Sequence, residues 1–154
     1  MEKVLVLGGS GFVGRHVCEK LNQQQIHVTV LTRRRENARH LQILPLVDVI
    51  EVANLDAASL AAQLTGHDAV VNLIAILHGS EAAFEKVHVG LPQALVSACQ
   101  VSGVKRVVHI SALGAAPDSP AMYQRSKSRG EAVLRESGLD VTLLRPSVIF
   151  WCRR

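Results

Sequence analysis

Short apolar segments alternate with longer amphipathic segments along the whole chain. Hydrophobic residues in the amphipathic segments recur at helical spacing, as Phe84, Val87, Leu91 and Leu95 do. Short, unbroken apolar strands separated by helices are typical of a parallel sheet covered on both faces. The pattern predicts an α/β fold with about six strands and five helical crossovers. The apolar segments, rich in Val, Ile and Leu, are residues 4–7, 28–31, 47–52, 69–74, 106–110 and 141–144.

Three glycines and one proline mark places where helices should end or deform. Each glycine follows a helical segment, where a C-terminal cap favours positive φ. They are Gly66, Gly103 and Gly138. Pro92 falls inside the amphipathic pattern of residues 81–101 and cannot donate a hydrogen bond to the carbonyl of His88. We therefore expect a kink near residues 89–90.

The composition indicates a globular chain. With 154 residues, 48% of them hydrophobic, we expect residues 1–154 to form a single domain, with residues 151–154 as an atypical tail. No apolar run approaches the roughly 18 residues of a membrane-spanning helix, and the chain enters "KVLVLGG" without room for a signal peptide. These features predict a cytoplasmic protein.

Cysteine and histidine placement adds no metal or disulfide site. Cys18, Cys99 and Cys152 are far apart, and the first two fall in helical patterns where a small buried hydrophobe is expected. The seven histidines lack the spacing of metal ligands. We expect neither zinc nor a structural disulfide.

Charge and aromatic content argue against nucleic acid as a partner. The net charge is +4, and the dense basic run is Arg33, Arg34 and Arg35, while aromatic residues make up only 3%. Proteins that bind nucleic acid usually spread basic residues over a face and add aromatic side chains for stacking. A smaller phosphate is the better partner for this run.

The first apolar segment leads directly into a glycine-rich loop, "GGSGFVG", and then into an amphipathic segment. Glycines permit the tight turn and let the backbone approach a pyrophosphate at the positive end of a helix. The loop predicts a doubly wound, Rossmann-type sheet that binds a dinucleotide; a tight turn without ligand is the alternative. The predicted phosphate loop comprises Gly8, Gly9, Ser10, Gly11, Phe12, Val13 and Gly14.

The end of the second apolar segment bears on the choice of dinucleotide. An NAD-binding domain usually carries an acidic residue there, which accepts hydrogen bonds from the ribose 2′-hydroxyl. This chain reads "VLTRRRENA" instead. Guanidinium groups can grip a 2′-phosphate that a carboxylate would repel, so Arg33, with Arg34 or Arg15 nearby, favours NADP(H) over NAD(H). A solvated basic start of a helix is the alternative.

Several phrases together resemble the short-chain dehydrogenase/reductase superfamily. They are "GGSGFVGRHV", "HDAVVNLIAIL", "VKRVVHISALGA", "YQRSKSRGE" and "GLDVTLLRPSVIF". The similarity is to the extended and atypical branch, which includes sugar-nucleotide epimerases and dehydratases, and within it to the group of the NADPH-carrying accessory subunit of respiratory complex I.

The resemblance implies roles for residues around the cofactor. Asn54 and Leu55 would lie by the adenine, and the turn of residues 73–76, including Ala75, would line the adenosine and its ribose. Pro146 and Ser147 would border the nicotinamide.

The resemblance also implies a catalytic group, because Tyr123 and Lys127 match the YxxxK motif and Ser111 precedes them at the family's interval. Tyr123 would act as acid or base, and Lys127, one helical turn away, would lower its pKa and bond the nicotinamide ribose. Ser111 would hold the substrate oxygen. A helix face with a half-buried tyrosine and a solvated lysine is the alternative.

Two departures from the family pattern qualify the catalytic interpretation. The phrase "VHVGLP" places His88 where relatives usually carry an Asn; it is either a substitute in a proton relay or a packing histidine. After "RPSVIF" the chain reads "WCRR", unlike the family's continuation into a substrate lobe. We expect a C-terminally truncated domain without that lobe, a bare sixth strand and no readable substrate.

Three functions remain open at this point. The first is NADP(H)-dependent oxidoreductase, epimerase or dehydratase-type hydride chemistry on an unidentified small molecule. The second is a non-catalytic NADPH-binding scaffold whose partner is a respiratory-complex or quinone-related protein, peripheral at the inner face of a membrane complex. The third is a non-functional remnant.

Overall fold

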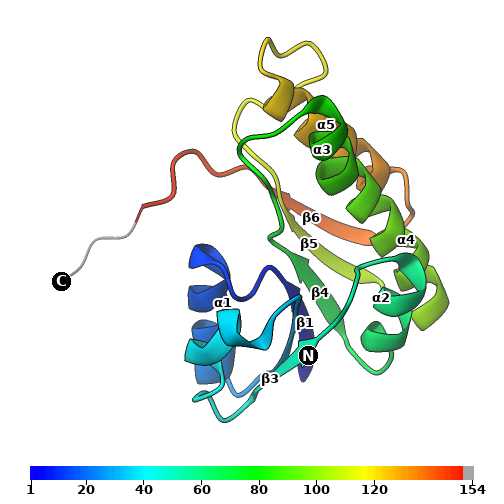
Figure 1. The fold of residues 1–154 in the computed structure, drawn as a ribbon. Helices are drawn as coiled ribbons and strands as arrows, with labels where there is room; N and C mark the ends of the chain where they lie inside the picture. The colour runs from blue at the N-terminus through cyan, green and yellow to red at the C-terminus, as the bar shows by residue number, and fades with distance from the viewer. Residues whose placement is uncertain (151–154) are drawn as a thin grey trace.

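Six parallel strands form a twisted sheet in the computed structural model, which describes residues 1–150 (Figure 1). The strand order is β3-β2-β1-β4-β5-β6, so β1 and β4 are neighbours at the centre although two other strands separate them in sequence. The predicted α/β fold of the doubly wound, Rossmann type is confirmed. The strands are β1 (Lys3–Leu7), β2 (His27–Thr32), β3 (Val47–Glu51), β4 (Ala69–Asn72), β5 (Arg106–Ile110) and β6 (Asp140–Leu144).

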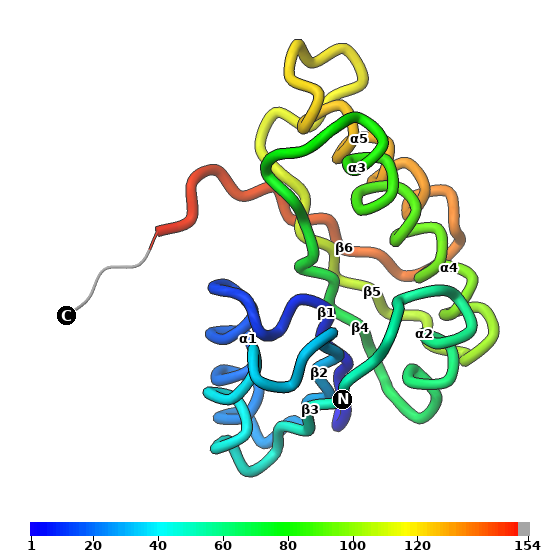
Figure 2. The backbone as a smooth tube through the Cα atoms, viewed as in Figure 1, coloured from blue at the N-terminus to red at the C-terminus, as the bar shows by residue number. Residues whose placement is uncertain are grey.

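Helices cover the sheet in two groups, one on each face (Figure 2). The helix α1 and the 3₁₀ segment η1 pack on one face, and α2, α4 and α5 pack on the other. The α3 segment leads into η2 and α4 as one helical run beside α5. The helical elements are α1 (Phe12–Gln23), η1 (Arg35–Leu41), α2 (Ala57–Leu64), α3 (Glu81–Glu85), η2 (Lys86–Gly90), α4 (Leu91–Ser102) and α5 (Met122–Arg135).

The central strand β1 shows why the apolar runs are unbroken. Leu5 and Leu7 point into the core beneath α2 and α4, whereas Val4 and Val6 point into the core beneath α1. Each side chain of the run is therefore buried, because successive residues of a strand face opposite sides of the sheet and helices cover both sides. Cys18 and Cys99 are buried in the same two cores, as predicted, and burial raises their thiol pKa to about 12 and about 11.

The predicted strands lie where the sequence places them, with ends that shift by one or two residues. The three glycines predicted to end helices all have positive φ, as a left-handed cap requires. Within residues 1–150, β6 is an edge strand that pairs with β5 alone, and its last residue, Leu144, is 48% exposed to solvent. The "WCRR" tail, including Cys152, lies outside the described residues.

Pro92 produces a π-helical turn. The N–H of Leu91 donates to the carbonyl oxygen of Lys86, five residues back, and the helix continues through Pro92 without interruption. A π turn is one way for a helix to absorb a residue that cannot donate to the carbonyl four positions earlier. The helix is therefore deformed near residues 89–90, as predicted, and the deformation is a π turn.

Candidate cofactor and catalytic site

The glycine loop joins β1 to α1 in a conformation that only glycine satisfies at three positions. Gly8 has a φ of +81°, which other residues rarely adopt. A Cβ on Gly14 would clash with the carbonyl oxygen of Gly8, and a Cβ on Gly9 would lie 2.7 Å from a methyl group of Val30. These contacts bring the first turn of α1 close against the end of β1.

The N-terminus of α1 is open to a ligand. Gly11 occupies the N-cap position, no side chain caps the helix, and the first turn carries no acidic residue. A Cβ on Gly11 would meet only the Gly8 oxygen, at 3.3 Å, and Gly11 itself is exposed. The N–H groups and positive dipole end of such a helix suit an anionic group. The residues present therefore fit the pyrophosphate of a dinucleotide.

The loop lies at the point where the strand order of the sheet reverses, between β1 and β4. Gly8 sits beside the turn after β4, since its Cβ position is 3.2 Å from atoms of Leu73 and Ile74. The buried Asn72 holds that turn: its Oδ1 accepts the N–H of Ile74 at 3.1 Å. The adjacent carboxyl ends of β1 and β4 form the crevice in which doubly wound folds bind ligands. Ala75 is exposed on this turn.

The basic run follows β2 at the same edge of the sheet as the glycine loop. Arg33, Arg34 and Arg35 are all exposed, and the N–H of Arg35 donates to Glu51 Oε2 at 2.8 Å. Arg15, the other candidate for the 2′-phosphate, is engaged on the surface of α1 by an ion pair with Glu19 at 2.8 Å.

Asn54, expected by the adenine, lies in the loop that precedes α2. Its Oδ1 accepts the hydroxyl of Ser59 at 3.0 Å, and Asp56 caps the helix by accepting the N–H of Ser59 at 2.8 Å. Asn54 is exposed and Leu55 is half-buried. The structure therefore gives Asn54 a local role at the start of α2.

Lys127 is buried at the end of β5. Its Nζ donates to the carbonyl oxygen of Ile110 at 2.7 Å, and its side chain is 1% exposed. Burial lowers the pKa of this amine to about 8, against the opposing effect of the Glu131 carboxylate. Ile110 directly precedes Ser111, so Lys127 and Ser111 both lie at the carboxyl end of β5.

Tyr123 does not show the electronic effect that the sequence predicts. Its half-buried ring packs edge-on against His88 and Phe84, with ring centroids 5.4 and 6.2 Å away. Burial raises the pKa of the Tyr123 hydroxyl, and no influence of Lys127 opposes that rise. The shift is opposite to the lowering that the sequence predicts, because burial of the phenol disfavours its charged form.

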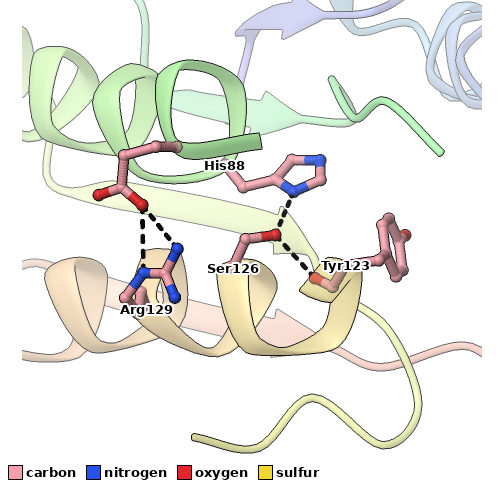
Figure 3. A network of polar contacts seen from close by, with 5 residues as sticks. His88, Tyr123, Ser126 and Arg129 are labelled. Carbon is pink, nitrogen blue, oxygen red and sulfur yellow. Dashed lines mark hydrogen bonds and ion pairs between the residues drawn. The ribbon is translucent and has the colours of Figure 1, made fainter. Parts of the chain in front are cut away.

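His88 forms hydrogen bonds through both ring nitrogens, and Figure 3 shows the bond to Ser126. Nε2 accepts the N–H of Ile76 at 3.2 Å, so Nδ1 carries the proton and donates to Ser126 Oγ at 2.7 Å. The Ser126 hydroxyl in turn donates to the carbonyl oxygen of Tyr123 at 2.8 Å. Burial and the nearby Lys127 charge lower the His88 pKa to about 4. His88 is thus a neutral, fully bonded histidine in the helix packing.

Two buried polar residues near Lys127, Glu131 and His109, escaped the sequence analysis. Glu131 accepts a forked pair of bonds from Arg145, and His109 faces the end of β4, where Asn72 Nδ2 donates to its Nδ1 at 3.2 Å. For Glu131 the sequence did contain a signal, because Tyr123, Lys127 and Glu131 recur at four-residue spacing and so share one helix face.

The glycine loop, the crevice and the open helix end agree with the comparison with known proteins. The sequence profile of NAD(P)H-binding proteins matches residues 8–150. The chain belongs to the NAD(P)H-binding family. The predicted similarity to the extended short-chain dehydrogenase/reductase branch and to complex I accessory subunits is confirmed.

Relatives of this NAD(P)H-binding domain differ in their named roles. The NADH-ubiquinone oxidoreductase 40 kDa subunit of Neurospora crassa is 30% identical over 149 residues, which cover 94% of this chain and 40% of that protein. The NAD(P)H azoreductase of Xenophilus azovorans is 29% identical over 147 residues, 93% of this chain and 47% of the enzyme. The chain spans less than half the length of both.

A solved structure shares the fold closely. The putative NAD-dependent epimerase/dehydratase from Bacillus halodurans superposes with a TM-score of 0.84 at 25% identity, covering 96% of this chain and 71% of that one. Among residues 1–150, no helix has the length and apolarity needed to cross a membrane.

A groove of about 690 Å³ is lined by residues of β2, β3 and α2. Thr29, Asp48 and His67 are among its lining residues, together with Lys3 at the start of β1. Arg35 of the basic run also lines this groove, which therefore reaches from the start of β1 to the segment after β2.

Proposed function

We propose that this domain holds NADP(H) in preference to NAD(H). The open N-terminus of α1 would take the pyrophosphate, and Arg33 and Arg34 would bind the 2′-phosphate at the end of β2. Two facts carry the proposal: these arginines are exposed, and no acidic residue stands at the end of β2. Charge-assisted, forked bonds from arginine to phosphate are stronger than neutral hydrogen bonds.

The remaining cofactor contacts follow from this placement. Asn54 and Leu55 would lie by the adenine, Ala75 would line the ribose side of the crevice, and Pro146 would border the nicotinamide. Their elements all end at the same edge of the sheet as the glycine loop. This common edge supports the assignment.

Calorimetric titration with NADPH and, separately, NADH tests the cofactor preference. We expect tighter binding of NADPH, and Arg33→Ala should weaken it about tenfold or more while leaving NADH binding unchanged. Arg39→Ala, which removes an equal charge from the exposed face of η1, is the matched control. Equal affinities for the two cofactors, or equal losses in both variants, would contradict the 2′-phosphate assignment.

We propose hydride transfer as a second function, with Tyr123 as acid or base and Ser111 and Lys127 as its supports. The observation in its favour is the convergence of Lys127 and Ser111 at the end of β5. A named azoreductase among the relatives is consistent with it. The alternative is an NADPH-holding scaffold in a respiratory assembly, consistent with the Neurospora subunit.

The substitution Tyr123→Phe separates these two functions. For a hydride-transferring domain, it should abolish turnover of the reduced cofactor with electron-accepting substrates and leave NADPH affinity unchanged, because the ring packing is kept. If the variant turns over as fast as the native chain, Tyr123 is not the acid or base. A native chain without turnover, whose assembly with a partner protein survives Tyr123→Phe, would favour the scaffold.

A further inference from the structure

A buried carboxylate and a partly exposed arginine meet behind the candidate catalytic residues. Glu131 on α5 has a side chain only 3% exposed, and Arg145 follows the end of β6. Arg145 Nε lies 2.8 Å from Oε1 and its Nη2 lies 2.5 Å from Oε2, a forked pair; Arg135 adds a contact of 3.3 Å. Planar forks of this kind fix geometry as well as charge.

The Glu131 carboxyl is held ionised by its neighbours. Burial by itself raises the pKa of the Glu131 carboxyl. The bonds from Arg145, the nearby Ser111 hydroxyl and the charge of Arg135 all lower this pKa, and together they outweigh burial, so the net shift is downward. The Ser111 hydroxyl lies near enough to the carboxylate to contribute, although it forms no hydrogen bond of normal geometry. A buried negative charge therefore persists beside Ser111.

The segment that carries Arg145 also fixes the backbone of the candidate site. The carbonyl of Leu144, immediately before Arg145, accepts the N–H of Ser111 at 2.7 Å. The carbonyl of Pro146, immediately after it, accepts the N–H of Leu113 at 2.9 Å. Arg145 thus projects from a short stretch that is bonded on both sides to the chain around Ser111.

Glu131 lies one helical turn beyond Lys127 on the buried face of α5. Lys127 ties the same helix to Ile110, the last residue of β5. Two polar links therefore join α5 to the ends of the last two strands. Of the two, only the Glu131–Arg145 link is an ion pair.

We propose that Glu131 and Arg145 are positioning residues: their forked ion pair holds α5 against the ends of β5 and β6 and thereby sets Lys127 and Ser111 in register. The functional meaning of this register rests on the proposed role of Lys127 and Ser111 at the nicotinamide. The contacts themselves belong to the cofactor-free protein.

The electrostatics around Lys127 give the proposal a direct readout. The titratable groups facing Lys127 are Glu131 and Tyr123 on α5, His88 on η2 and His109 on β5, with Arg145 beyond Glu131. The two histidines are neutral near pH 7, so Glu131 is the negative group that acts on the amine. Without it, burial should lower the Lys127 pKa further below about 8.

Lysine labelled with ¹³C at Cε lets the Lys127 pKa be measured by NMR titration of the cofactor-free protein, with Lys127→Met used for assignment. We expect Glu131→Gln to lower this pKa by about one unit, a tenfold change in the ionisation constant. The control is Glu85→Gln, which removes a carboxylate that also takes a fork from an arginine of α5, Arg129, at 3.1 and 2.6 Å, but at the surface. Equal shifts in the two variants would overturn the proposal.

Melting temperatures test the positioning link separately. Arg145→Met should lower the melting temperature more than Glu131→Gln does. Arg145→Met leaves the buried Glu131 carboxylate without its main partner, whereas in Glu131→Gln the partly exposed Arg145 can turn to solvent. The double variant should recover most of that loss, yet its Lys127 pKa should stay as low as in Glu131→Gln. A double variant that restores the Lys127 pKa would overturn the proposal.

If Arg145→Met does not fold, Arg145→Lys replaces it, because lysine keeps the positive charge but cannot form the forked pair of bonds to Glu131. Arg145→Lys should leave the Lys127 pKa unchanged and raise the rate of hydrogen exchange at the Ser111 amide. Unchanged exchange there would overturn the positioning role. Failure of NADPH binding, in contrast, would sink the proposed cofactor function and leave these measurements intact.

Discussion

At the scale of single residues, the loop glycines serve different purposes. Gly14 is needed by the fold, because any side chain there would run into the backbone of Gly8. Gly11 is different: it is exposed, and a Cβ would meet only one atom, at 3.3 Å. Its glycine leaves the helix end open to a pyrophosphate rather than relieving an internal clash.

The two glycines should therefore respond differently to alanine. Gly14→Ala should destabilise the protein by about 2 kcal/mol or more, through overpacking against the backbone. Gly11→Ala should leave the free energy of unfolding nearly unchanged and weaken NADPH binding. Urea unfolding and calorimetric titration of both variants would check this pair; a Gly11→Ala protein that binds NADPH normally would argue against pyrophosphate at this helix end.

At the scale of elements, the π turn η2 determines how α4 and α5 pack. The turn places His88 so that its ring reaches Ile76 and Ser126, and its carbonyl oxygen points at Gly130 of α5. A Cβ on Gly130 would clash with that oxygen, and it would lie 3.6 Å from Cγ of Pro92. The close approach of the two helices thus depends on a glycine in one and a proline-induced turn in the other.

Alanine substitutions at two helical glycines test this packing. Gly130→Ala should destabilise the protein by about 3 kcal/mol, because α5 must move away from η2. Gly90→Ala, in the same π turn, should stabilise it by about 0.5 kcal/mol, since φ is −60° and the nearest atom to a Cβ lies at 3.7 Å. Urea unfolding at neutral pH measures both; similar effects of the two substitutions would contradict the close contact.

At the scale of the whole molecule, buried histidines make the stability depend on pH. His88 and His109 have pKa values lowered to about 4 and about 3, by burial first and by the charge of Lys127 second. Burial also lowers the pKa of His67. All three are protonated more readily in the unfolded chain, where the ordinary pKa is about 6.5. Their contribution to stability is complete above pH 6.5 and is lost as the pH falls.

We expect the free energy of unfolding to fall between pH 6.5 and pH 5 with a slope of up to about 1.4 kcal/mol per pH unit for each buried histidine. Carboxylates add to the loss only at lower pH, so this window isolates the histidines. Urea unfolding at pH 7.5, 6 and 5 measures the slope, and His88→Gln should reduce it by one histidine's share. A flat profile across the window would show that these histidines bind protons equally well in the folded protein.

Local rules made much of the fold readable from the sequence. Apolar runs, helical spacing and caps depend on residues a few positions apart, and these placed all six strands, the glycine loop and the site of the π turn. The arginine run after β2 and the Tyr123–Lys127 spacing are equally local. That is why the strand positions and the NAD(P)H-binding family could be inferred from the amino-acid sequence alone.

Tertiary structure decided the rest, because it depends on contacts between distant segments. The pairing of β1 with β4 creates the crevice, and the fork between Glu131 and Arg145 joins α5 to the end of β6. Lys127 bonds a strand carbonyl seventeen residues away in sequence, and burial of Tyr123 raises the pKa of its hydroxyl instead of lowering it. Helical spacing places Tyr123 and Lys127 on one face, but only three-dimensional packing determines what each of them contacts.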